Sequence, residues 1–224
     1  MIIMKTAIKR LVAVVSAMAL IFVSWMIVVA SDGMEPDDDE VEVSANVLTG
    51  AEVLTSEADA VQATALSLNA KSIILMEAST GRVLYESNAD EKLRPASVTK
   101  IMTILLVMEA IKSGTISADD IISVSENAAS MGGSQVYLAP GEQMSVEELL
   151  KCVIISSAND ASVALAEHVA GSEEAFIQRM NERAEQLGMI NTNFVNTSGL
   201  DDLPESDKHL TSARDVAIMS REIV

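Results

Sequence analysis

Apolar residues beyond position 70 recur mostly at helical spacing. Positions 98, 101, 102, 105, 108 and 111 are apolar, and no Gly or Pro interrupts 98–111, which predicts one buried face of a helix. Comparable patterns predict helices over 146–155, 161–170 and 172–187, and another that begins near 211–213. Gly114 and Gly188 directly follow two of these stretches, and each is expected to end its helix.

Two shorter stretches favour antiparallel strands. Residues 72–77 and 82–86 flank Ser79-Thr80-Gly81, a turn in which the glycine can adopt positive φ. Residues 135–138 and 143–145, on either side of Ala139-Pro140-Gly141-Glu142, predict a second and smaller hairpin. Ser145 and Glu148 then match a capping box for the next helix. A helical cluster with a small antiparallel sheet is an α/β architecture of the α+β type.

The first thirty residues have the composition of an export segment. Lys5, Lys9 and Arg10 precede an uninterrupted apolar run over 11–30, and no acidic residue occurs before it. The small residues that end at Ala30 suit signal-peptide cleavage, whereas twenty apolar residues also suffice for an uncleaved membrane anchor. In both cases the basic N-terminal side places the rest of the chain outside the cytoplasm, secreted or membrane-associated.

Residues 31–66 are strongly acidic, and no Lys or Arg occurs between Arg10 and Lys71. This composition predicts a disordered linker before a domain over 67–224. A calcium-binding loop is disfavoured, because such a loop needs alternating ligands and a glycine. The net charge of -18 argues against nucleic acid or an anionic membrane surface as a partner. Cys152 is the one cysteine, so no disulfide can form within the chain.

Ser97 and Lys100 form the most informative pair of polar residues. Ser97 follows Pro95-Ala96 at the predicted start of the helix over 98–111, where free N–H groups favour a developing negative charge. Lys100 lies one turn further on, within reach of the serine hydroxyl. A lysine desolvated among apolar neighbours can lose its proton near neutral pH and act as a base. A helix cap followed by a surface lysine would give the same spacing.

Ser157 and Asn159 lie between two predicted helices, where a short loop would display both side chains. A serine hydroxyl can carry a proton to a leaving group, and an asparagine amide can hold a lysine and a substrate backbone. No His, Cys or carboxylate cluster recurs at metal-ligand spacing near these residues, so we expect neither a metal nor a cofactor.

Residues 70 to about 224 resemble the serine-type D-alanyl-D-alanine carboxypeptidases, which are low-molecular-weight penicillin-binding proteins. The similarity extends over KLRPASVTKIMT, SSANDASVALAEHVAG, NTNFVNTSGLDD and HLTSARDVAIMSREI. It implies a β-lactamase/transpeptidase-like fold, with Ser97 as the acylated nucleophile, Lys100 as the general base, and Ser157 and Asn159 as the second motif. It also implies peptidoglycan stem peptides ending in D-Ala-D-Ala as substrate, and β-lactam antibiotics as ligands. His209 would border the active-site cleft and support structure rather than chemistry.

The third motif of that family, Lys-Thr-Gly on a strand, does not follow Asn159. Lys112-Ser113-Gly114 has similar letters but falls where a helix is expected to end. Because the sequence stops at Val224 within a helical pattern, we expect a truncated chain whose sheet lacks its C-terminal strands. Two alternatives to a carboxypeptidase remain: a β-lactamase-like hydrolase, and an inactive fragment without catalysis.

Overall fold

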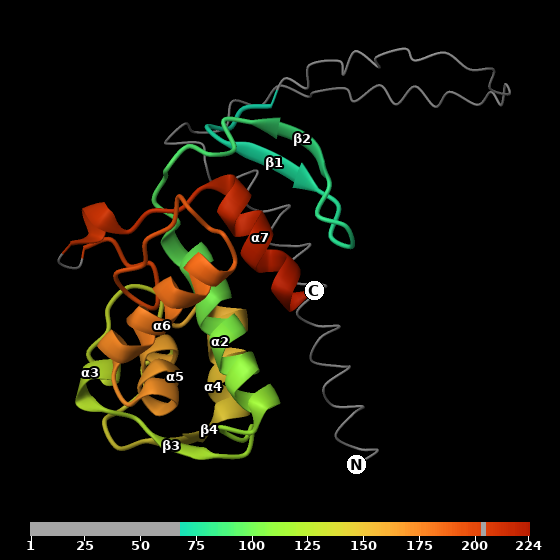
Figure 1. Ribbon diagram of the computed structural model, residues 1–224. Coiled ribbons are helices and arrows are strands. Elements are labelled where there is room, and N and C mark those ends of the chain that lie inside the picture. Colours follow the sequence, from blue (N-terminus) through green and yellow to red (C-terminus); the bar gives the residue numbers. More distant parts are fainter. Residues whose placement is uncertain (1–67, 203–204) are drawn as a thin grey trace, which may run out of the picture. The chain divides into compact units, whose positions relative to one another are not determined.

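The computed structural model describes residues 68–202 and 205–224 (Figure 1). The elements follow one another as β1 (Ile73–Met76), β2 (Val83–Ser87), the 3-10 turn η1 (Ala96–Thr99), α2 (Lys100–Ser113), β3 (Ile121–Ser123), α3 (Glu126–Ala129), β4 (Gln143–Ser145), α4 (Val146–Ser156), α5 (Asn159–Ala170), α6 (Glu173–Gln186), the 3-10 turn η2 (Ser206–Lys208) and α7 (Ala213–Ile223). The predicted export segment over 1–30 and acidic linker over 31–66 lie outside the described residues.

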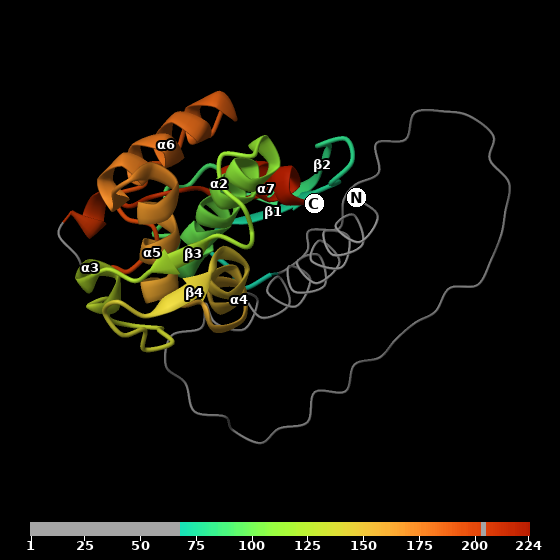
Figure 2. The ribbon, with the colours of Figure 1, turned by 90° about the horizontal axis from the view of Figure 1, so that it is seen from below.

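Helix α5 lies at the centre of the apolar core and contacts α2, α3, α4 and α6 (Figures 1 and 2). Most of its residues are buried, which is typical of a helix that is surrounded on nearly all sides. The largest fully buried side chains come from α5 and its neighbours, and they include Leu149, Leu165, Phe176 and Met180. The predicted helices are therefore present and share one core, with the mixed helix and strand content of an α+β fold.

The two short antiparallel strand pairs, the β1–β2 hairpin and the pair of β3 with β4, lie at opposite ends of this helical group (Figure 1). Strands β1 and β2 pair antiparallel, with Ile74 opposite Glu86, and Gly81 adopts the left-handed φ of 75° in the turn between them. Helix α7 contacts both β1 and α2, so it ties this hairpin to the helices. No helix within the described residues combines the length and the apolar character needed to cross a bilayer.

The prediction of strand structure over 135–138 is wrong. Strand β4 pairs instead with β3, with Ile121 opposite Ser145. The N–H groups of Val136 and Leu138, which a strand would give to its partner, donate to the buried carboxylate of Asp160 at 3.1 and 3.0 Å. A buried carboxylate needs such donors, so it holds this loop in a non-strand conformation.

The structure confirms two predicted signals at helix ends. Gly114 caps α2 in the left-handed conformation, with φ of 76°. Ser145 and Glu148 form the capping box, because each side chain accepts the other residue's backbone N–H at 3.2 and 2.9 Å. Helix α4 therefore begins at a fixed point, and it ends beside the two residues of the second motif.

Candidate active site

Ser97 lies in a tight 3-10 turn that leads directly into α2. The predicted helical start is thus present, but its first turn is 3-10 and the α-helix begins at Lys100. Ala96, the residue before the serine, has a φ of 45°, which is uncommon for a residue with a Cβ. Such strain persists only where surrounding contacts impose it, and it concentrates at functional sites.

Gly199 and Thr99 hold the strained carbonyl of Ala96. The Thr99 hydroxyl donates a hydrogen bond to it at 2.8 Å. Gly199, with φ of 82°, approaches so closely that a Cβ at this position would lie 1.7 Å from the Ala96 oxygen. Only glycine permits that approach. The nucleophile turn is therefore fixed by its own helix on one side and by a distant loop on the other.

Lys100 is buried directly behind Ser97, with 4% of its surface exposed. Its Nζ lies 3.3 Å from Ser97 Oγ and donates to the Ser198 carbonyl at 2.9 Å. Burial lowers the pKa of Lys100 to about 8. At pH 7 about one tenth of the lysine is then neutral. The neutral amine can keep its bond to Ser198 while its lone pair accepts the proton of Ser97.

Ser157 and Asn159 meet at the junction of α4 and α5, but the prediction that a loop displays both is wrong for Asn159, because α5 already begins there and packs this side chain in the interior. Ser157 caps α4 in the left-handed conformation, with φ of 53°, and Asn159 is the buried first residue of α5. The Asn159 side-chain amide donates to the Gly132 carbonyl at 2.8 Å. Within residues 68–202 and 205–224, neither side chain is hydrogen-bonded to Ser97 or Lys100. Their roles as proton shuttle and positioning amide therefore stay predictions.

The loop over 195–200 supplies contacts that the sequence did not predict. Asn196 Oδ1 accepts the N–H groups of Ser198 and Gly199 at 3.2 and 2.6 Å. The Thr103 hydroxyl on α2 donates to the Thr197 carbonyl at 2.7 Å. These bonds place the Ser198 carbonyl against Lys100. Because a backbone oxygen makes that contact, the residue type gives no signal, although the Asn-Thr-Ser-Gly run does indicate a turn.

His209 lies behind the nucleophile turn and is 4% exposed. Its Nε2 lies 2.7 Å from Thr99 Oγ1, and its Nδ1 accepts the Val195 N–H at 3.1 Å. Burial lowers the pKa of His209 to about 4. The imidazole is therefore neutral at physiological pH, and it contacts the turn rather than the serine itself.

Cys152 and His168 lie outside this arrangement. Burial raises the pKa of the Cys152 thiol, so it stays protonated and is a poor nucleophile. His168, on α5, has its Nε2 3.6 Å from a carboxylate oxygen of Asp120, the residue before β3. Among the residues that the structure describes, no three His, Cys, Asp or Glu side chains are placed to hold a metal ion.

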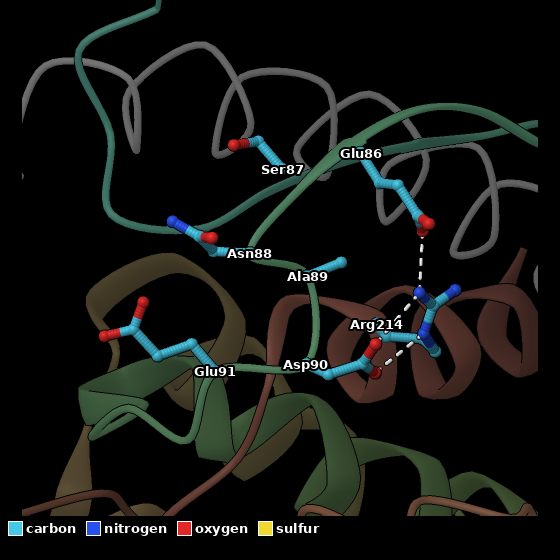
Figure 3. Close-up of a pocket in the computed structure, with 7 residues that line it drawn as sticks. All are labelled: Glu86, Ser87, Asn88, Ala89, Asp90, Glu91 and Arg214. Atoms are coloured by element: carbon cyan, nitrogen blue, oxygen red, sulfur yellow. Dashed lines mark hydrogen bonds and ion pairs between the residues drawn. The ribbon is translucent and has the colours of Figure 1, made fainter.

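A surface pocket between β2 and α7 is an ion-pair junction (Figure 3). The Arg214 guanidinium donates to both oxygens of Asp90, at 2.8 and 3.1 Å, and to Glu86 at 2.6 Å. Its donors are thus used to connect α7 to the hairpin. The pocket contains none of the candidate catalytic residues, and its contacts indicate a structural role.

The chain is similar to known peptidases over most of its length. The sequence model of the D-alanyl-D-alanine carboxypeptidases of peptidase family S11 matches residues 57–224. The chain is 49% identical to D-alanyl-D-alanine carboxypeptidase DacF of Bacillus subtilis (strain 168) over 178 residues, which are 80% of this chain and 45% of DacF. It is 45% identical to DacC of Escherichia coli (strain K12) over 164 residues, which are 70% of this chain and 40% of DacC.

Solved structures agree with this similarity. The crystal structure of DacD from Francisella tularensis superposes with a TM-score of 0.68 and 38% identity, covering 75% of this chain and 40% of DacD. Penicillin-binding protein 5 from Haemophilus influenzae gives a TM-score of 0.65 and 39% identity, covering 69% of this chain and 44% of that protein. The chain therefore spans less than half of the length of these relatives.

Proposed function

Because this chain belongs to the D-alanyl-D-alanine carboxypeptidase family, we propose that it supplies the acylation machinery of a serine carboxypeptidase that acts on peptidoglycan stem peptides. The observation that carries the proposal is the position of Lys100. Its Nζ is buried between Ser97 Oγ and the Ser198 carbonyl, at 3.3 and 2.9 Å, and burial lowers the pKa of this lysine to about 8. A surface lysine beside a helix-capping serine would have neither property.

The reaction begins with transfer of the Ser97 proton to neutral Lys100. Oγ then attacks the carbonyl carbon of the peptide bond between the two terminal D-alanines, and a tetrahedral oxyanion forms. The Ser97 N–H lies at the start of the 3-10 turn, where N–H groups lack an acceptor within the helix, and it donates to that oxyanion.

Collapse of the tetrahedral intermediate breaks the C–N bond. The terminal D-alanine leaves with a proton that Lys100 returns, carried by the Ser157 hydroxyl, and an ester to Ser97 remains. Asn159 positions the lysine and the peptide backbone during this step. Water then hydrolyses the ester, with Lys100 again accepting a proton, and the shortened peptide is released.

A β-lactam would acylate the same serine. Attack of Ser97 on the ring carbonyl opens the lactam, and the leaving nitrogen stays attached to the acyl group. A β-lactamase would have to hydrolyse that ester rapidly. The relatives with 49% and 45% identity are named carboxypeptidases, which favours the slower, penicillin-binding behaviour.

We also propose an extracytoplasmic location, where the peptidoglycan substrate lies. The basic start of the chain followed by the apolar run over 11–30 supports export, either as a cleaved signal peptide or as a membrane anchor. The acidic segment over 31–66 would then be a linker to the catalytic domain, which begins at about residue 67.

The test is release of D-alanine from diacetyl-Lys-D-Ala-D-Ala by the protein expressed from its full coding sequence. We expect turnover by the parent and by Ser113→Ala, a control at an exposed serine at the end of α2. Ser97→Ala should release no D-alanine above background. Turnover by Ser97→Ala equal to that of the parent would exclude the proposed function.

A further inference from the structure

A buried histidine lies one hydrogen bond behind the nucleophile turn. His209 comes from the segment before α7, 110 residues away from Thr99 in sequence, yet its Nε2 lies 2.7 Å from the Thr99 hydroxyl. Both side chains are buried. The mechanism proposed above uses neither residue, so their contact requires a separate explanation.

The hydrogen-bond partners of His209 permit one neutral tautomer. The Thr99 hydroxyl donates its only hydrogen to the Ala96 carbonyl at 2.8 Å. Thr99 can therefore only accept from His209, so His209 Nε2 must carry the hydrogen and donate to Thr99. On the other side of the ring, the Val195 N–H donates to Nδ1 at 3.1 Å, which requires a lone pair there. If Nδ1 carried a hydrogen, its N–H would face the Val195 N–H, and the hydrogen bond between them would be lost.

The surroundings of the ring favour the same neutral state. The ring of Phe194 contacts His209 edge to face, with centroids 5.8 Å apart. Burial lowers the pKa of His209 to about 4, and the Asp201 carboxylate is the charged group that opposes this shift. The imidazole therefore acts as a fixed donor and acceptor, not as a base.

The peptide unit at the end of this chain of bonds contains the proposed oxyanion donor. The Ala96 carbonyl and the Ser97 N–H belong to one planar trans peptide, so fixing the oxygen fixes the direction of the N–H. Ala96 has a strained φ of 45°, and Gly199 closes on the same oxygen from the other side. A small rotation of this peptide would turn the N–H away from the oxyanion.

We propose that His209 is a positioning residue: through Thr99 it holds the Ala96–Ser97 peptide so that the Ser97 N–H is aimed at the developing oxyanion. This role rests on the proposed function of Ser97 as the nucleophile. It predicts loss of transition-state stabilisation with little change in substrate binding, because the N–H bonds the oxyanion more strongly than the substrate carbonyl.

The test compares variants that keep the bonds with variants that remove them. Gln at position 209 offers one N–H donor and one carbonyl acceptor, and Ser at position 99 keeps the hydroxyl. We expect His209→Gln and Thr99→Ser to retain kcat for D-alanine release within about threefold. His209→Leu and Thr99→Val should lower kcat about 10- to 100-fold with KM changed by less than about threefold, less than loss of an entire oxyanion donor.

Two further measurements separate positioning from general destabilisation. In a Thr99→Val background, His209→Leu should reduce kcat by less than about twofold, because the connection is already broken. Nitrogen-15 NMR of histidine-labelled protein should show His209 as the Nε2–H tautomer, a readout that does not depend on activity.

Several outcomes would overturn the proposal. Parental kcat in the isosteric Thr99→Val variant would do so even if His209→Leu failed to fold. An Nδ1–H tautomer, or independent effects of the two substitutions, would do the same. A parent protein that releases no D-alanine and is not acylated by penicillin would instead overturn the proposed function, and the positioning role with it.

Discussion

The buried position of Lys100 predicts the pH dependence of acylation. With a pKa lowered by burial to about 8, the lysine is about one hundredth neutral at pH 6, one tenth at pH 7 and nine tenths at pH 9. If neutral Lys100 is the base, the acylation rate should rise roughly tenfold from pH 6 to pH 7, then level off above pH 9. Over pH 6 to 9 the increase should be about 90-fold.

The assay is the second-order rate of labelling by a fluorescent penicillin, at constant ionic strength, on the protein expressed from its full coding sequence. Lys100→Arg is the informative variant, because guanidinium keeps the positive charge but cannot lose its proton in this range. It should lose acylation at every pH. Lys112→Arg, at an exposed lysine near the end of the same helix, is the matched control and should follow the parent profile.

The free energy of unfolding should also depend on the titration of Lys100. The pKa of Lys100 is lower in the folded state than in the unfolded state, where it is 10.5. The unfolded chain therefore binds more protons between about pH 8 and 10.5, and the contribution of this lysine to stability rises with pH across that window.

A flat acylation profile from pH 6 to 9, or near-parental acylation in Lys100→Arg, would show that Lys100 acts only as a charge.

Three substitutions test other parts of the site. Gly199→Ala should lower acylation more than tenfold, because its Cβ would lie 1.7 Å from the Ala96 oxygen; Gly171→Ala, also at positive φ but with open space around it, should leave acylation unchanged in the same penicillin assay. Asp160→Asn replaces a buried carboxylate that accepts several backbone N–H groups, so it should lower the free energy of unfolding in urea by about 2–3 kcal/mol. The control Asp119→Asn, at an exposed aspartate, should lower it by less than about 0.5 kcal/mol. The lowered pKa of His209 predicts stability that is complete above about pH 6.5 and declines by roughly 3 kcal/mol as the pH falls to about 4; a His209→Gln variant with the same acid profile in urea unfolding would contradict this.

The features that the sequence predicted depend on neighbouring residues. The spacing of apolar residues over 98–111 gives the face of α2, and Gly114 ends it because a left-handed residue is needed there. Ser97 and Lys100 lie three residues apart, so one helical turn brings them together whatever surrounds them. The capping box at Ser145 follows the same logic.

The features that the sequence did not predict depend on residues far apart in the chain. The pattern over 135–138 predicts a strand, but its N–H groups bond to the carboxylate of Asp160, more than twenty residues further along the chain. Ser198 contributes a backbone carbonyl, which every residue possesses, to a lysine 98 positions earlier. His209 could be noted as a neighbour of the site, but its bond to Thr99 requires the packing of the segment before α7 against the nucleophile turn.

Identification of the acylated residue tests the central claim most directly. After incubation with benzylpenicillin, the protein is digested with trypsin and the modified peptide is fragmented in the mass spectrometer. We predict that the added mass lies on Ser97 and not on Thr99, and that Ser97→Ala shows no modified peptide while Cys152→Ala is modified like the parent. A penicilloyl group on another residue, or a modified peptide that persists in Ser97→Ala, would contradict the assignment of the nucleophile.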